Sequence, residues 1–233
     1  MKAIQKAVVL ALAMALAPAN AWAADLALTG GAGHQFKVPV VSLKEARFKT
    51  VVKQKYDFSC GSAALASLLT FHYDRPTSEE DVFRGMYENG DKEKIRKAGF
   101  SLLDMKNELQ RLGYKSDGFK TNLDNMVKLG VPGIALIDNR GYKHFVVVKG
   151  VAADRVVIGD PASGVRVVSG ESFLELWKDE VLFVIRSKAS VGRDNFNLKD
   201  DWDVQAKAPF GTALSHQSLG SFTVHLHLGT NTF

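Results

Sequence analysis

The chain has 233 residues, of which 46% are hydrophobic and 24% are charged, and its formal net charge at pH 7 is +5. A positive charge this small gives no indication of nucleic-acid binding. Cys60 is the only cysteine, which excludes a fold held together by intramolecular disulfides.

The N-terminus has the layout of a secretory signal peptide. Two lysines precede an apolar run over residues 7–17, and the small-residue string Ala21-Trp22-Ala23 follows that run. A run of about 11 residues is too short to cross a bilayer of about 30 Å, so a retained membrane anchor is the less favoured alternative. We therefore expect cleavage after Ala23 or Ala24 and export to the periplasm. The mature chain would have no transmembrane segment and a net charge of +3, because the removed segment carries two lysines and no acidic residue.

Helical patterns dominate the first half of the mature chain. Apolar residues recur there at steps of three and four. Thr77 with Glu80, and Ser101 with Asp104, are spaced as in the capping boxes that begin helices. Glycines follow the last two segments and are expected to end them. The predicted helices span residues 59–73, 77–87, 101–112 and 122–129.

The second half changes to patterns typical of strands. Runs rich in valine and isoleucine alternate with turn-forming strings such as Asp160-Pro161, and a short helix is expected over residues 171–178. Helices followed by an antiparallel sheet predict an α+β fold, in which an N-terminal helical layer packs on a C-terminal antiparallel sheet. The predicted strands span residues 131–137, 142–149, 155–159, 165–169 and 181–186.

Cys60 lies in the first turn of the predicted helix over residues 59–73. Backbone N–H groups and the helix macrodipole favour negative charge at that end, which lowers the pKa of a thiol. The position favours a nucleophile over a buried inert thiol or an intermolecular disulfide. Gln54 lies six residues upstream and can return on its loop to donate its amide to the oxyanion that forms when a thiolate attacks a carbonyl. A solvated loop glutamine is the alternative.

A cysteine nucleophile needs a base, and the base needs an acceptor that orients it. His144 begins a valine-rich run, and Asp160 follows sixteen residues later, so an antiparallel return can bring the two side by side. A half-buried strand histidine and a turn-initiating aspartate are the ordinary alternatives. His72 is excluded because it lies about 18 Å along the same helix from Cys60. The remaining histidines, which no pattern fixes near that helix, are His34, His216, His225 and His227.

Together these residues resemble the motif blocks of the C39 peptidases, which are papain-fold domains that cleave leader peptides in bacteriocin export. The resemblance spans roughly residues 50–187 and implies a papain-like cysteine peptidase fold. It also implies that Cys60 is the nucleophile, His144 the base, Asp160 the orienting acid and Gln54 the oxyanion donor. The blocks are Gln54-x5-Cys60-Gly61-x-Ala63-Ala64, Tyr142-Lys143-His144-Phe145-Val146-Val147 and Gly159-Asp160-Pro161, with Gly99-Phe100-Ser101-Leu102-Leu103 and Leu112-Gly113-Tyr114 between them.

The chain differs from the bacteriocin type in the segments that accompany the peptidase domain. That type is usually fused to membrane-spanning and ATP-binding segments, whereas this chain has an export signal and no Gly-x-x-x-x-Gly-Lys-Ser/Thr string. It is similar to the stand-alone, exported members of the family that are encoded with Fap-type functional amyloid secretion systems. The resemblance implies cleavage of a protein or peptide substrate, an amyloid or its secretion machinery, without a cofactor. The alternatives are a catalytically silent peptide-binding or chaperone module, and acyl transfer by the same triad.

We expect four segments along the chain. They are a signal peptide (1–23), a glycine-rich flexible lead-in (24–49), a C39-like peptidase domain (50–187) and a C-terminal extension (188–233), with a short strand or loop over 38–52. The extension either folds back on the domain or forms an arm. Apolar residues alternate with others over residues 222–228, which is typical of a strand. His225 and His227 lack a third ligand there, so no metal site is predicted. The sequence predicts no oligomeric state.

Overall fold

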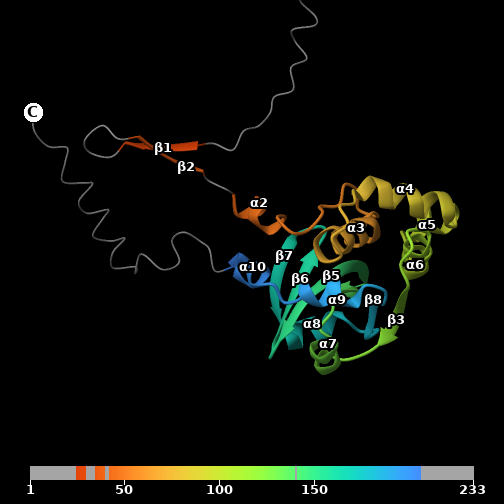
Figure 1. Ribbon diagram of the computed structural model, residues 1–233. Coiled ribbons are helices and arrows are strands. Elements are labelled where there is room, and N and C mark those ends of the chain that lie inside the picture. The colour runs from red at the N-terminus through yellow and green to blue at the C-terminus, as the bar shows by residue number, and fades with distance from the viewer. Residues whose placement is uncertain (1–24, 30–34, 40–41, 140, 206–233) are drawn as a thin grey trace, which may run out of the picture. The chain divides into compact units, whose positions relative to one another are not determined.

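The computed structural model describes residues 25–29, 35–39, 42–139 and 141–205 (Figure 1). The chain divides into two units, Met1–Ser42 and Leu43–Phe233, which are described separately below. Several expectations lie outside the described residues: the signal peptide, the strand over 222–228, His34 and the three histidines of the tail.

A β-hairpin lies in the first unit, where a flexible lead-in was expected. β1 (Asp25–Thr29) pairs with β2 (Gln35–Pro39) in antiparallel fashion, so that Asp25 faces Pro39 and Thr29 faces Gln35. Apolar residue types alternate along both segments, which is the period of a strand. The glycines that suggested flexibility fall between the two strands.

The second unit is built on a six-stranded sheet in which every neighbouring pair is antiparallel, in the order β3-β8-β4-β5-β6-β7. All five expected strands are confirmed. The additional strand, β3, has the sequence Ser-Asp-Gly-Phe-Lys, which has little intrinsic strand preference and is held by its pairing with β8. The strands are β3 (Ser116–Lys120), β4 (Gly133–Asn139), β5 (Tyr142–Ala152), β6 (Arg155–Asp160), β7 (Gly164–Ser169) and β8 (Val181–Ile185).

The structure also confirms the five expected helices and adds four short ones. One of these, α5, is too short and too charged to show an apolar period, and it begins where the Asp91 carboxylate accepts the N–H groups of Glu93 and Lys94. The helices are α2 (Leu43–Arg47), α3 (Cys60–His72), α4 (Glu79–Asn89), α5 (Lys92–Ala98), α6 (Leu102–Arg111), α7 (Leu123–Leu129), α8 (Gly170–Leu176), α9 (Ala189–Asp194) and α10 (Lys199–Trp202), the last followed by a 3-10 turn, η2 (Asp203–Gln205).

The two expected capping boxes have different outcomes. Ser101 and Asp104 form the box at the start of α6 as expected. The expected box of Thr77 with Glu80 is wrong, because Ser78 is the N-cap of α4 and its hydroxyl accepts the Asp81 N–H at 3.1 Å. The one-residue shift turns the side chain of Glu79 into the protein, while Glu80 stays exposed.

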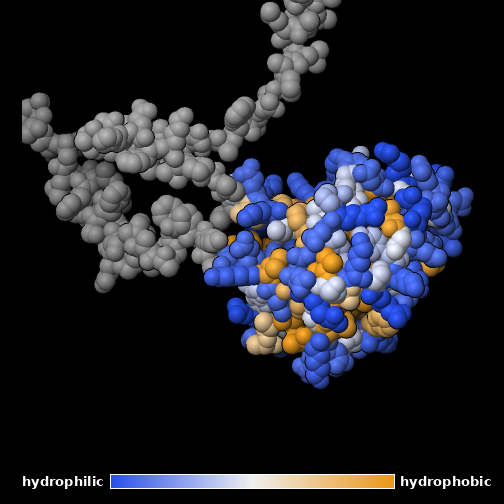
Figure 2. Space-filling view, in the orientation of Figure 1, coloured by the Kyte–Doolittle hydropathy of each residue, from blue (hydrophilic) through white to orange (hydrophobic). Residues whose placement is uncertain are grey.

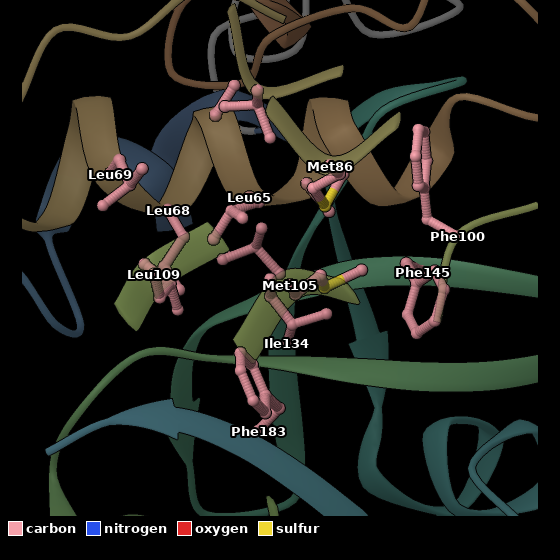
Figure 3. Close-up of a cluster of buried hydrophobic side chains, with 14 of the residues drawn as sticks. Leu65, Leu68, Leu69, Met86, Phe100, Met105, Leu109, Ile134, Phe145 and Phe183 are labelled. Atoms are coloured by element: carbon pink, nitrogen blue, oxygen red, sulfur yellow. The ribbon is translucent and has the colours of Figure 1, made fainter. Parts of the chain in front are cut away.

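Helices cover both faces of the sheet. On one face, Leu65 and Leu68 of α3 and Met105 of α6 pack over Ile134 and Phe183 of the sheet (Figure 3). This is the expected N-terminal helical layer, and its core includes Cys60. The opposite face is covered by side chains from α7, α8 and the segment after α9, namely Met126, Phe173, Trp177 and Phe196. Burial of such side chains, each worth about 1.5–3 kcal/mol, fixes the sheet against both layers.

The described part of the C-terminal extension folds back onto the sheet. The Asn197 N–H donates to the Lys149 carbonyl at 3.0 Å, and the Asn197 side-chain amide donates to the Val151 carbonyl at 3.1 Å. Asp201 of α10 forms a buried ion pair with Lys149 at 3.3 Å. Residues 189–205 are therefore bound to β5 by both backbone and side-chain contacts.

Candidate active site

Cys60 is the first residue of α3 and is 8% exposed. Ser59 precedes it as the N-cap residue, but the Ser59 hydroxyl makes no capping bond to the first turn. That hydroxyl instead bonds to Glu79 and Tyr56. The first N–H groups of α3 are therefore not taken up by the cap, and the Gly61 N–H contacts the Cys60 sulfur.

The surroundings of Cys60 favour its thiolate. Burial alone would raise the pKa of the thiol. A hydrogen bond to His144, the backbone N–H of Phe145, the charge of His144 and the Gly61 N–H together outweigh burial and lower the pKa below its ordinary value of 9.0. All of these groups lie at the start of α3 or at the start of β5, so the lowered pKa of Cys60 arises where this helix meets the sheet.

The sheet brings His144 and Asp160 together. In the register, Val147 of β5 faces Gly159 of β6, which sets Asp160 diagonally across from His144. His144 Nε2 lies 2.8 Å from Asp160 Oδ1, and each residue is 5% exposed. Because Nε2 is bonded to Asp160, Nδ1 is the ring nitrogen that remains for Cys60, and it is buried without a hydrogen-bond partner among the described residues.

Coupling between these groups stabilises their charged forms. Burial lowers the pKa of His144, but hydrogen bonds to Asp160 and Cys60 and their charges outweigh it and raise the pKa to about 9. Burial raises the pKa of Asp160, but hydrogen bonds from His144 and Ser163 hold it well below 3.8. At neutral pH His144 is therefore an imidazolium and Asp160 a carboxylate, and their charges shift Cys60 toward its thiolate form.

Asp160 has further partners that the sequence analysis did not include. Its carboxylate accepts the Ala162 N–H at 2.8 Å and the Ser163 hydroxyl at 2.7 Å, and Arg166 Nη2 lies 3.0 Å from Oδ2. Arg166 comes from the next strand, β7, which the predicted turn after Asp160 returns alongside β6. These bonds hold the carboxylate in place while it contacts His144.

Tyr142 is a second residue that was missed, although the strand period could have indicated it. Alternation along β5 puts residues 142 and 144 on the same face of the sheet. The Tyr142 ring stacks on the His144 ring with centroids 5.9 Å apart, and the Tyr142 hydroxyl donates to the Asp57 carbonyl at 3.3 Å. The Tyr142 side chain therefore links the histidine to the loop that precedes Cys60.

Gln54 lies on that same loop. Its backbone N–H donates to the Pro161 carbonyl at 3.0 Å, which ties the loop to the turn after Asp160. Its side-chain Nε2 donates to the Tyr56 carbonyl at 3.1 Å, and Oε1 is buried without a hydrogen-bond partner among the described residues. Cys60, His144 and Asp160 are thus in direct contact, whereas the amide of Gln54 bonds within its own loop.

A separate cavity lies away from these residues. It has a volume of about 430 Å³ and is lined mainly by apolar side chains of β3, β8 and the end of α7, such as Phe119, Leu129 and Leu182. Figure 2 shows a largely hydrophilic surface on this unit, with hydrophobic atoms exposed around α7 and β3. None of Cys60, His144 and Asp160 lines this cavity.

The described residues contain no group of three or more His, Cys, Asp and Glu side chains placed to hold a metal ion. None of their helices combines the length and the hydrophobicity of a membrane span.

Comparison with known proteins agrees with this fold. The family model of the Peptidase C39 family matches residues 48–189. The chain is 41% identical over 166 residues to the probable functional amyloid protease FapD of Pseudomonas fluorescens. This alignment covers 70% of this chain and 73% of that protein. The chain is also 41% identical over 159 residues to FapD of Pseudomonas aeruginosa, which covers 68% and 70%. Among solved structures, the peptidase domain of Streptococcus ComA, a bi-functional ABC transporter involved in quorum sensing, aligns with a TM-score of 0.50 and 24% identity over 58% of this chain and 96% of that domain.

The α+β fold and the matches to the family model and to the two relatives define a papain-like cysteine peptidase, an enzyme that acts on protein or peptide substrates. The match to the family model covers more than half of the chain, so the chain belongs to the Peptidase C39 family.

Proposed function

We propose that the chain is an exported peptidase that cleaves a peptide bond in a protein partner, with Cys60, His144 and Asp160 as its catalytic triad. The observation that carries this proposal is the arrangement of the His144 ring, which holds Asp160 at 2.8 Å through Nε2 and leaves Nδ1 for the buried sulfur of Cys60.

The geometry supports a two-step acyl transfer. The Cys60 thiolate attacks the peptide carbonyl and forms a bond from sulfur to carbon, while the carbonyl oxygen becomes an oxyanion. His144 donates the Nδ1 proton to the leaving amine as the C–N bond breaks. Water then attacks the thioester and gives a proton back to His144, which releases the second product and restores the thiolate. Asp160 keeps the ring in the orientation and tautomer that both steps need.

We assign the oxyanion to Gln54 and to the backbone N–H of Cys60. The Gln54 amide uses one N–H for the Tyr56 carbonyl and has a second N–H for a substrate oxygen. Its buried Oε1 has no partner among the described residues, which is a costly state that a catalytic role would explain.

We further propose that the substrate belongs to a functional amyloid system and is processed in the periplasm. The names of the two Pseudomonas relatives support the amyloid assignment, because both are described as probable functional amyloid proteases. The signal-like sequence over residues 1–23 supports the location. Limited cleavage of one partner fits this setting better than general digestion.

The test compares residues 24–233 with the same chain carrying Cys60→Ala. Each is incubated with the secreted proteins encoded beside it, and new termini are identified by sequencing. The proposal expects one new terminus with the wild-type chain and none with the variant. The same terminus with both proteins would reject Cys60 as the nucleophile, and binding without cleavage by both would favour a peptide-binding module.

A further inference from the structure

Glu79 is a buried carboxylate that the mechanism above does not use. It is the first residue of α4 and is 4% exposed. The Lys55 N–H donates to both of its oxygens, at 3.2 and 3.1 Å, and the Ser59 hydroxyl donates to Oε1 at 2.5 Å. Lys55 directly follows Gln54, and Ser59 directly precedes Cys60. One side chain therefore fastens both ends of the loop that separates the proposed oxyanion donor from the nucleophile.

A second set of bonds carries this restraint to the Gln54 side chain. The Tyr56 N–H donates to the Ser59 hydroxyl at 3.2 Å, and the Tyr56 carbonyl accepts the Gln54 amide at 3.1 Å. The bonds thus run from Glu79 through Ser59 and Tyr56 to Gln54. A hydrogen bond weakens steeply when its donor and acceptor move apart, so a shift of Glu79 would move the Gln54 amide as well.

Glu79 also determines what the Ser59 hydroxyl does. Serine is a preferred N-cap residue, and its hydroxyl normally accepts the N–H of the second or third residue of the helix. In α3 the second residue is Gly61, whose N–H contacts the Cys60 sulfur instead. Glu79 and the backbone of Tyr56 together hold the Ser59 hydroxyl away from the capping position, which leaves this N–H available to the thiolate.

We propose that Glu79 is a positioning residue of the peptidase. It holds the loop from Gln54 to Cys60 in the geometry for acyl transfer and prevents Ser59 from capping α3. This inference rests on the proposed function, because it assumes that Cys60 and Gln54 act in peptide cleavage. Glu79 acts through those residues and does not contact the reacting atoms.

The test substitutes Glu79 and its neighbour. Glu79→Gln keeps one acceptor oxygen and places an NH₂ group against the other donor. We expect kcat to fall about 10- to 100-fold, as for a displaced oxyanion donor, with KM changed less than about threefold. Glu80→Gln is the matched control, because Glu80 is exposed and its ion-pair partner in the described part of the chain is the exposed ammonium group of Lys55. Its kcat should stay within about twofold of wild type.

A second readout separates positioning from simple support of the fold. In Glu79→Gln the Ser59 hydroxyl loses its charged partner, keeps only its bonds to Tyr56 and can shift toward the Gly61 N–H, so the pH midpoint of Cys60 alkylation should move upward. Adding Ser59→Ala removes that competitor and should return the midpoint to the wild-type value, while kcat stays low. Loss of fold stability alone would not produce this reversal.

Several results would overturn the inference. One is a folded Glu79→Gln protein whose kcat lies within twofold of wild type, and another is an equal loss in Glu80→Gln. If Glu79→Gln does not fold, Ser59→Ala alone cuts the link to Cys60, and unchanged kcat in that variant would reject the inference. Failure of the proposed function is a different result, because processing would then survive Cys60→Ala.

Discussion

Two buried ion pairs lie five residues apart along β5, and only one of them adjoins a cysteine. His144 faces Asp160, and Lys149 faces Asp201. The four residues are all at most 5% exposed. Burial of a charged pair therefore does not by itself identify an active site, since β5 contributes to two buried ion pairs.

The two pairs differ in what lies next to them. The Lys149–Asp201 pair is bonded to Thr50, whereas the His144–Asp160 pair lies beside the thiol of Cys60. Lys149 Nζ donates to the Thr50 carbonyl at 3.0 Å, and Asp201 Oδ1 accepts the Thr50 hydroxyl at 2.7 Å, so the second pair is enclosed by its own partners. Burial lowers the pKa of Lys149, although Asp201 opposes the shift. His144 has the opposite shift, and its Nδ1 is directed at Cys60. We therefore propose a catalytic role for the first pair and a structural role for the second.

The largest expected effect comes from disrupting the His144–Asp160 pair, which should impair catalysis. Asp160→Asn should lower kcat by about 10⁴-fold, because an amide does not stabilise the imidazolium or hold the correct tautomer. Steady-state cleavage of the identified substrate measures this, with urea denaturation to verify folding. A variant that keeps more than a tenth of wild-type kcat would show that Asp160 does not orient His144.

The next effect is on stability. Asp201→Ala leaves Lys149 charged and buried, and we expect the free energy of unfolding to fall by about 3–5 kcal/mol, with kcat of the folded protein within about twofold. Urea denaturation measures the first quantity. Asp200→Ala is the matched control, since Asp200 forms an exposed pair with Lys49 at 3.9 Å, and its stability should equal that of wild type. A marked loss of kcat in folded Asp201→Ala would contradict the division of roles.

The pH dependence gives a third test. Above pH 9, kcat should fall about tenfold per pH unit as His144 loses the proton that it donates to the leaving amine. Stability follows the same sign: since the folded pKa is raised to about 9, the His144 contribution is complete below about pH 6.5 and is lost as the pH rises to about 9. The Asp160 contribution is present above about pH 4 and is lost as the pH falls through its lowered pKa. In Asp160→Asn the alkaline limb should begin at lower pH, and an unchanged limb would contradict the assignment.

The smallest effect concerns Tyr142. Its ring stacks on His144, so Tyr142→Ala should lower kcat/KM by about 2- to 10-fold, in line with the worth of an aromatic contact. Tyr142→Phe keeps the ring and loses only a 3.3 Å bond to Asp57, so it should remain within about twofold of wild type. Equal losses in both variants would show that the hydroxyl matters rather than the stacking.

The strands and the long helices could be predicted because their patterns are local. The start of α4 shows where this approach fails: Thr77-Ser78-Glu79-Glu80-Asp81 contains two overlapping capping strings, Thr77 with Glu80 and Ser78 with Asp81. The sequence offers no way to choose between them. The folded protein uses the second, in which Glu79 is buried against the loop before Cys60.

The candidate site was predicted for the residues that form recognisable motifs and not for those that support them. Cys60, His144 and Asp160 stand in motif blocks, and the structure brings them into contact. The contact of Asp201 with Lys149 depends on the return of the C-terminal segment, which no local spacing indicates. Long-range packing thus decides which charged residues are buried.

The most direct test of the central claim is the rate of Cys60 alkylation by iodoacetamide as a function of pH, in the wild-type chain and in His144→Ala. The account predicts that Cys60 reacts faster than free cysteine at neutral pH, with a midpoint below the ordinary thiol value, and that the midpoint rises when His144 is removed. A wild-type rate no faster than that of free cysteine, or the same midpoint in both proteins, would contradict the claim that His144 and the helix start hold Cys60 as a thiolate.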